Sequence, residues 1–187
     1  PTVMIGGTLP LLGKGYRVGS GDTIILESCE YCNSFLSFYP TVAVVLNVAA
    51  DHLDFFKDLA DIQHSFRAFA DLVPDRGMVV ANWDDEGVRA TFKDYPRPLC
   101  RCSVKDKSVE VYAENVAFFD GFGDFDVIAE GKHYAHVSLR VPGSHNVANA
   151  LCAAAAAYVL GVDGSAVEQG LHDFIGAGRR FEYKGEF

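Results

Sequence analysis

Two short stretches hold the residues best suited to metal chemistry. Glu30 ends the stretch Glu-Ser-Cys-Glu at 27–30, and residues 51–54 read Asp-His-Leu-Asp. Each follows an apolar run typical of a strand, so both fall at the carboxyl ends of two expected neighbouring parallel strands, where open α/β sheets form their sites. Carboxylates suit Mg²⁺, and a histidine is a less usual ligand beside them. We therefore predict a magnesium site here, with the alternative that Asp51 caps a turn and His52 is an ordinary loop histidine.

Four of the five cysteines form a second pattern. Cys29 and Cys32 stand in a C-x-x-C frame, whereas Cys100 and Cys102 stand in a C-x-C frame, which is a poor spacing for a zinc chelate. A redox C-x-x-C usually opens a helix, but here the motif closes an expected strand. We interpret these thiols as small buried residues, and a zinc-stabilised module built on the four cysteines is the alternative.

Two further patterns fail on their spacing. The segment GTLPLLGKG approaches a phosphate-binding loop, but five residues rather than four separate Gly7 from Gly13, and Gly15 stands where Ser or Thr should bind magnesium. His133 and His136 lie three residues apart in an expected strand, so we predict that they point to opposite faces and share no metal.

The segment SHNVANA offers polar groups at the start of an expected helix. Asn146 and Asn149 lie on one face, and their amides could read the edge of a purine; helix capping is the alternative. Near the end of the chain, Arg179 and Arg180 could grip phosphate oxygens or could be solvated.

Strands and helices alternate along most of the chain. Strands are expected at 2–7, 15–18, 23–28, 41–48 and 76–82, with several more between 99 and 142; helices are expected at 58–73, 86–95, 144–161 and 165–174. Ser144 is the expected N-cap of the third helix and Gly161 its stop. The order indicates an α/β fold, a mostly parallel doubly wound sheet flanked by helices, with a small appended antiparallel β section at 99–142.

Composition restricts the class of protein. A chain of 187 residues suits one domain, and a net charge of −9 argues against a nucleic-acid partner, which needs a basic face. No apolar run approaches the roughly 20 residues of a membrane span. An odd number of scattered cysteines without a signal peptide fits the cytoplasm. The apolar start PTVMIGG lacks a Met, so we expect a piece of a longer protein.

The chain resembles the central ATP-binding domain of the Mur ligases, which assemble the peptidoglycan stem peptide. The resemblance is carried by ESCEYCNSFLSFYPTVAVVLNVAADHLD, HNVANALCAAAAAYVLG and GAGRRFE, in this order. It covers nearly the whole chain, and the ordered set is more specific than any one motif. It is strongest for the branch that joins L-alanine to UDP-N-acetylmuramate. In these ligases ATP phosphorylates the substrate carboxylate, and the amine attacks the acyl phosphate, with ATP and Mg²⁺ as the cofactors.

The resemblance implies site residues and boundaries. The site residues fall into three groups: catalytic magnesium ligands near the γ-phosphate, Glu30 and His52; nucleotide contacts, His145, Asn146, Asn149 and Arg180; and candidate substrate contacts, Ser34 and Asn47. Residues 1–178 correspond to the central domain and 179–187 to the start of a linker to a C-terminal domain. The phosphate loop and a UDP-binding domain are expected before residue 1, so the 187 residues alone should bind Mg-ATP weakly and be inert.

Two departures from the family bear on the branch. Members of the alanine-adding branch often read Glu-Ala-Asp-Glu-Ser-Asp where residues 27–32 read Glu-Ser-Cys-Glu-Tyr-Cys, so that only the glutamates persist. Later stem-peptide ligases carry a modified lysine in the helix after the histidine loop, but ADIQHSFRAF has none. The alternatives are a related amino-acid or peptide ligase of the same fold and a non-catalytic α/β interaction module.

Overall fold

The computed structural model describes residues 1–178. The strands of this part are β1 (Thr2–Leu9), β2 (Lys14–Arg17), β3 (Ile24–Leu26), β4 (Val42–Val45), β5 (Met78–Asn82), β6 (Leu99–Ser103), β7 (Val111–Phe119), β8 (Phe122–Ala129) and β9 (Lys132–Pro142). The helices are the 3₁₀ segment η1 (Tyr31–Ser37), α1 (Leu59–Asp71), α2 (Glu86–Phe92), α3 (Ser144–Val159) and α4 (Gly164–Asp173). The predicted strands and helices are therefore observed, most of them within a few residues of the expected ends.

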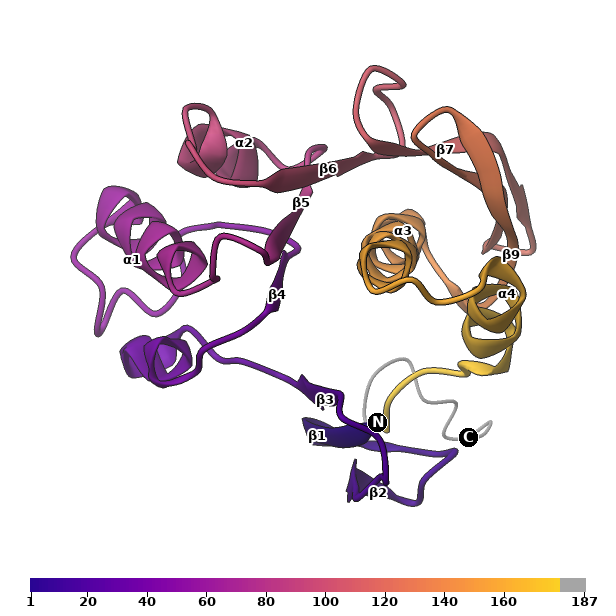
Figure 1. The fold of residues 1–187 in the computed structure, drawn as a ribbon, viewed down its shortest axis with the longest axis horizontal. Helices are drawn as coiled ribbons and strands as arrows, with labels where there is room; N and C mark the ends of the chain where they lie inside the picture. The colour runs from indigo at the N-terminus through magenta and orange to yellow at the C-terminus, as the bar shows by residue number, and fades with distance from the viewer. Residues whose placement is uncertain (179–187) are drawn as a thin grey trace, which may run out of the picture.

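The main sheet has six strands in the order β4-β5-β6-β7-β8-β9, and it curves around α3 as a half-barrel (Figure 1). Strands β4 to β7 run parallel, and β7, β8 and β9 run antiparallel. The α/β fold is thus confirmed. The antiparallel section begins at β7, later than predicted, because β6 is parallel to both of its neighbours.

Two tight hairpins reverse the chain in the antiparallel section. Asp120 and Gly121 join β7 to β8 with φ of 51° and 85°, and Glu130 and Gly131 join β8 to β9 with φ of 48° and 74°. Positive φ at both central residues matches the twist of the flanking strands, which is why Gly follows the acidic residue in each turn.

Side chains of the parallel strands bury two faces. On β5, Val80 packs into a cluster with Leu151 of α3, whereas Val79 packs on the opposite face with Ile62 of α1 and Phe92 of α2. Figure 1 shows the same layering, with α3 inside the curved sheet and α1 and α2 outside it. The continuous apolar runs of the sequence follow from this burial on both faces.

Aspartates begin three of the helices. The side chains of Asp58, Asp85 and Asp163 accept hydrogen bonds from the first-turn N–H groups of α1, α2 and α4. The predicted N-cap of α3 was wrong by one residue, because Gly143 is the cap and Ser144 is already helical. Gly143 has φ of 104°, a conformation that favours glycine. Gly161 ends the helix as predicted, with φ of 71°.

The first three strands form a separate sheet in the order β2-β1-β3. We expected the strand before Glu30 to neighbour β4 in one sheet, and this was wrong: β3 pairs with β1, whereas β4 lies at the end of the six-stranded sheet. An apolar run indicates that a strand forms, but it does not identify the partner strand. Within residues 1–178, no helix combines the length and hydrophobicity that crossing a bilayer requires.

Candidate metal-binding site

The loops that follow β3 and β4 meet, although the two strands lie in different sheets. His52 Nε2 lies 3.4 Å from Glu30 Oε1, and His52 Nδ1 lies 4.0 Å from Asp51 Oδ1. Ligand atoms of Glu30, Asp51 and His52 all lie within 4.8 Å of one another, and in the described part of the chain no other three His, Cys, Asp or Glu residues do so. Two carboxylates and an imidazole are a donor set that a hard divalent cation accepts.

The backbone of the second loop is held in an unusual conformation. His52 has φ of 51°, a left-handed value that is uncommon outside glycine. Asp51 Oδ1 accepts the N–H of His52 at 2.7 Å, and the N–H groups of Phe55 and Phe56 both donate to the His52 carbonyl at 2.9 Å. Asp51 therefore caps the turn, as the alternative interpretation expected, and the same carboxylate also faces the imidazole.

The first loop is anchored to α1. Cys32 and Asn33 are left-handed, with φ of 53° and 57°, and Ser65 of α1 donates a hydrogen bond to the Asn33 side chain. Phe35 is 2% exposed and stacks on Phe69 of α1 with ring centroids 4.7 Å apart. These contacts fix the segment that begins directly after Glu30.

The two interleaved glutamates have different surroundings. Glu27 Oε2 accepts the N–H of Gly6 in β1 at 2.7 Å, so this carboxylate joins β3 to β1. Glu30 instead faces His52 across the gap between the loops. Their spacing in the sequence does not distinguish these roles.

Sequence reasoning missed Tyr31. Its hydroxyl donates to Asp54 Oδ2 at 3.0 Å, and its ring lies 4.7 Å from the imidazole of His52. The hydrogen bond to Asp54 is the main reason that the pKa of Tyr31 is raised above its usual value. Nothing in the spacing of the residues points to this pair.

The cysteines do not assemble a site within residues 1–178. Cys100 and Cys102 are buried in β6 as predicted, but Cys29 and Cys32 are exposed, because β3 ends at Leu26 and the motif lies beyond it. No three of the thiols come close enough to share an ion. The zinc alternative therefore has no geometric support.

His133 and His136 share one face of β9, contrary to the prediction. The pairing of β8 with β9 shifts by one residue between Ala135 and His133, and this bulge brings both histidines to Asp126. His136 Nδ1 lies 2.9 Å and His133 Nε2 3.4 Å from Asp126 Oδ1, while His136 Nε2 lies 3.5 Å from Asp124 Oδ2. The period-two rule failed because it assumes an unbroken strand.

This cluster should make stability depend on pH. The hydrogen bond with Asp126 raises the pKa of His136, and hydrogen bonds from Asn115 and then His136 lower the pKa of Asp126. The contribution of His136 is fully present below about pH 6.5 and is lost as pH rises through its raised pKa; that of Asp126 is lost as pH falls through its lowered pKa, below about pH 3.9. Urea titrations should show His136→Gln losing at most about 1 kcal/mol near pH 5.5 and less at pH 8, because these side chains are partly exposed.

The exposed His64 of α1 supplies the control. His64→Gln removes a histidine that lies outside the cluster around Asp126, so its unfolding free energies at pH 5.5 and pH 8 are the reference for those of His136→Gln. Equal losses for His136→Gln at pH 5.5 and pH 8 would contradict the assignment.

The remaining predicted contacts are spread over the molecule. Asn146 Nδ2 donates to the Pro142 carbonyl at 2.7 Å, which ties α3 to the end of β9, and Asn149 Nδ2 lies 3.5 Å from Asn146 Oδ1. Neither side chain caps the helix, since within residues 1–178 no side-chain hydrogen bond caps the N-terminus of α3. His145 is exposed in the first turn of α3. Ser34 in η1 donates to the Tyr31 carbonyl. Asn47 is exposed in the segment after β4, and Arg179 and Arg180 lie outside the described residues.

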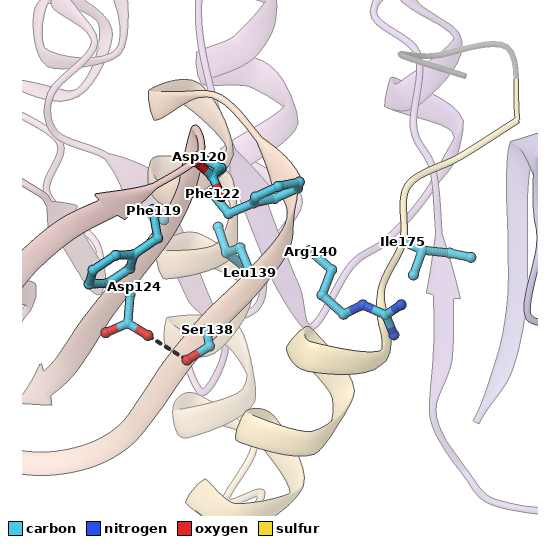
Figure 2. Close-up of a pocket in the computed structure, with 9 residues that line it drawn as sticks. Phe119, Asp120, Phe122, Asp124, Ser138, Leu139, Arg140 and Ile175 are labelled. Carbon is cyan, nitrogen blue, oxygen red and sulfur yellow. Dashed lines mark hydrogen bonds between the residues drawn. The ribbon is translucent and has the colours of Figure 1, made fainter. Parts of the chain in front are cut away.

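A cavity of about 640 Å³ lies away from Glu30 and His52, beside the β7–β8 hairpin. Figure 2 shows Phe119 and Phe122 from the hairpin strands, the Ser138–Asp124 hydrogen bond and Arg140, which extends toward the segment with Ile175. The hairpin is tied to the start of α3, because Gly143 N–H donates to the Gly121 carbonyl at 2.9 Å. The cavity therefore neighbours the predicted nucleotide-binding helix start rather than the carboxylate–histidine group.

Comparison with known proteins identifies relatives over the whole chain. The family described as "Mur ligase middle domain" matches residues 16–157. The UDP-N-acetylmuramate–L-alanine ligase of Caldicellulosiruptor bescii is 42% identical over 188 aligned positions, covering 100% of this chain and 41% of that protein. The chain thus spans about two fifths of the length of this relative.

Two solved structures share the fold. The UDP-N-acetylmuramate-alanine ligase of Thermotoga maritima superposes with a TM-score of 0.81 at 27% identity, covering 100% of this chain and 41% of that one. The UDP-N-acetylmuramate:L-alanyl-gamma-D-glutamyl-meso-diaminopimelate ligase of Neisseria meningitides gives a TM-score of 0.80 at 28% identity, covering 96% and 59%.

Proposed function

Because the chain belongs to the Mur ligase family through that family's middle domain, we propose that it is the ATP-binding part of a cytoplasmic ligase that joins L-alanine to UDP-N-acetylmuramate in peptidoglycan synthesis. The observation that carries the proposal is the approach of Glu30 to His52 from two separate loops, in a chain 42% identical to a relative of that name. The family alone would leave the amino acid open, and this identity favours alanine.

Glu30, His52 and Asp51 fit a magnesium ion. Ligand atoms of both carboxylates and of the imidazole lie within 4.8 Å of one another. The side chains of Glu30 and His52 are 31% and 34% exposed, so water and phosphate oxygens can reach an ion bound between them. Mg²⁺ prefers one or two carboxylates and keeps several waters, which a partly open site allows. When bound, the ion would neutralise phosphate charge during phosphoryl transfer.

The proposed reaction has two steps. A carboxylate oxygen of UDP-N-acetylmuramate attacks the γ-phosphorus of ATP, so that an acyl phosphate forms and ADP leaves. The amine of L-alanine then attacks the acyl carbon, the amide forms, and phosphate and a proton leave. The protein contributes by orienting the reactants and balancing their charge, as is usual for phosphoryl transfer.

The residues around the site have proposed parts in binding. Asn149, with His145 beside it, would contact the nucleotide at the start of α3, where Asn146 already donates to the backbone. Ser34 and Asn47 would face the sugar-linked substrate, and Arg180 would contact a phosphate group. The remaining domains of such a ligase would supply the phosphate loop and the amino-acid site.

The test uses a ligase that contains these 187 residues and has the full length of the relatives. Phosphate release is measured with Mg-ATP and UDP-N-acetylmuramate against a panel of L-alanine, other amino acids and a stem tripeptide. We expect L-alanine to support turnover at least about 100-fold faster than the others. Turnover with the tripeptide alone would identify a peptide-adding relative, and no phosphate release with any acceptor would favour a non-catalytic module.

A further inference from the structure

Tyr31 connects the two loops of the proposed metal site. It directly follows Glu30 in the chain, and its hydroxyl donates to Asp54 Oδ2 at 3.0 Å. Asp54 lies two residues after His52, so one hydrogen bond ties the loop of one proposed ligand to the loop of the other. The contact between His52 Nε2 and Glu30 Oε1 itself is longer, at 3.4 Å.

The ring of Tyr31 also covers the imidazole. The ring centroids of Tyr31 and His52 are 4.7 Å apart with a tilt of 41°. Tyr31 also meets Phe55 edge-on with ring centroids 6.1 Å apart, and Phe55 meets Phe56 edge-on at 4.9 Å. Because Phe56 is only 2% exposed, this column of rings connects Tyr31 to the hydrophobic core.

The orientation of a partly exposed histidine depends on the groups around it. The side chain of His52 is 34% exposed, with Nε2 toward Glu30 and Nδ1 toward Asp51. A rotation of the imidazole by about 180° around its Cβ–Cγ bond would put ring carbons where Nε2 and Nδ1 now face Glu30 and Asp51, and a rotation around Cα–Cβ would turn the ring into solvent. Groups around a ligating histidine commonly fix its orientation, and their loss weakens metal binding.

We propose that Tyr31, held by Asp54, is a positioning residue that keeps His52 Nε2 turned toward Glu30 for metal binding. The inference rests on the proposed metal site and goes beyond it, because neither residue ligates the ion. The hydroxyl sets the position of the tyrosine through Asp54, and the ring restricts the imidazole. The two halves of the tyrosine can therefore be tested separately.

The test measures Mn²⁺ binding to the 187-residue chain through the paramagnetic relaxation of water protons. The imidazole C–H resonances of His52 are recorded as a second readout. Tyr31→Leu should weaken Mn²⁺ binding about 10-fold and shift the His52 resonances, because the ring current of the tyrosine is removed. In Tyr31→Phe the His52 resonances should stay close to their positions in the unmodified chain, and Mn²⁺ binding should weaken by a smaller factor than in Tyr31→Leu. Asp54→Asn should resemble Tyr31→Phe, and combining the two should add no further loss, since both remove one hydrogen bond.

Two controls separate the inference from the proposed function. Tyr39 is 82% exposed, so Tyr39→Leu should change neither Mn²⁺ affinity nor the His52 resonances. His52→Gln should weaken Mn²⁺ binding strongly. If His52→Gln weakens binding but Tyr31→Leu and Tyr31→Phe do not, the positioning role is overturned and the metal site stands. If His52→Gln has no effect either, the metal site itself is overturned.

Discussion

Replacing Glu30 by glutamine in the full-length ligase is expected to lower alanine-dependent phosphate release by about 100-fold or more. Glutamine keeps the size of the side chain but removes the negative charge that faces His52 at 3.4 Å. A loss of several kcal/mol of charge stabilisation in the transition state corresponds to this factor. The measurement is initial phosphate release at saturating ATP and substrates, repeated over a series of Mg²⁺ concentrations. Part of the lost rate should return at high Mg²⁺, because the weakened site is then filled.

Glu27 provides a matched control for this variant. It lies three residues before Glu30, and it hydrogen-bonds to the N–H of Gly6 at 2.7 Å rather than to the histidine loop. Glutamine can accept the same hydrogen bond, so Glu27→Gln should change the rate less than about 3-fold. Equal rates for Glu30→Gln and the unmodified enzyme at every Mg²⁺ concentration would refute the assignment of Glu30.

Replacing Gly87 by alanine should destabilise the fold by about 2–4 kcal/mol. A Cβ at this position of α2 would lie 1.8 Å from the carbonyl oxygen of Val48, and a backbone atom cannot move aside as a flexible side chain can. Asp85 also links Val48 to the first turn of α2, since its Oδ1 accepts the N–H groups of Val48 at 3.1 Å and Val88 at 2.8 Å. Urea unfolding of the 187-residue chain, followed by circular dichroism, measures the change.

Gly170 in α4 is the control for Gly87, because nothing lies within 4 Å of a Cβ at that position. Gly170→Ala should therefore stabilise the chain by up to about 1 kcal/mol through helix propensity alone. Similar unfolding free energies for the two variants would show that α2 does not pack against Val48 as described. Since Val48 lies in the segment that leads from β4 to His52, Gly87→Ala should also weaken Mn²⁺ binding.

Much of the local structure could be predicted because it depends on neighbours along the chain. The three- and four-residue spacing of Ile62, Phe66 and Phe69 predicts α1, and the apolar run at 41–48 predicts β4. The family was also recognisable, since several motifs in a fixed order identify it although no single motif does. In this sense the sequence by itself determined the fold class, the order of most elements and the two loops that carry the candidate ligands.

The tertiary structure decided how those pieces meet. The run before Glu30 could not show whether β3 pairs with β4 or β1, because the hydrogen bonds of a strand do not depend on which side chains it carries. The bulge that brings His133 and His136 to Asp126 lies in the run KHYAHVSLRV, whose sequence pattern does not mark it. In both cases the deciding interaction is formed with a strand that the local pattern does not identify.

The site shows the same division. The sequence placed Glu30 and His52 in polar loops after strands. Only the folded chain shows that Glu27 bonds to β1, that His52 has a left-handed backbone and that Tyr31 lies between the loops. Residue type and spacing express what a side chain can do chemically and which local conformation it favours. Distance between loops is a property of the packed molecule, because it depends on the strand pairing in both sheets and on the buried contacts of α1, which join segments remote in the sequence.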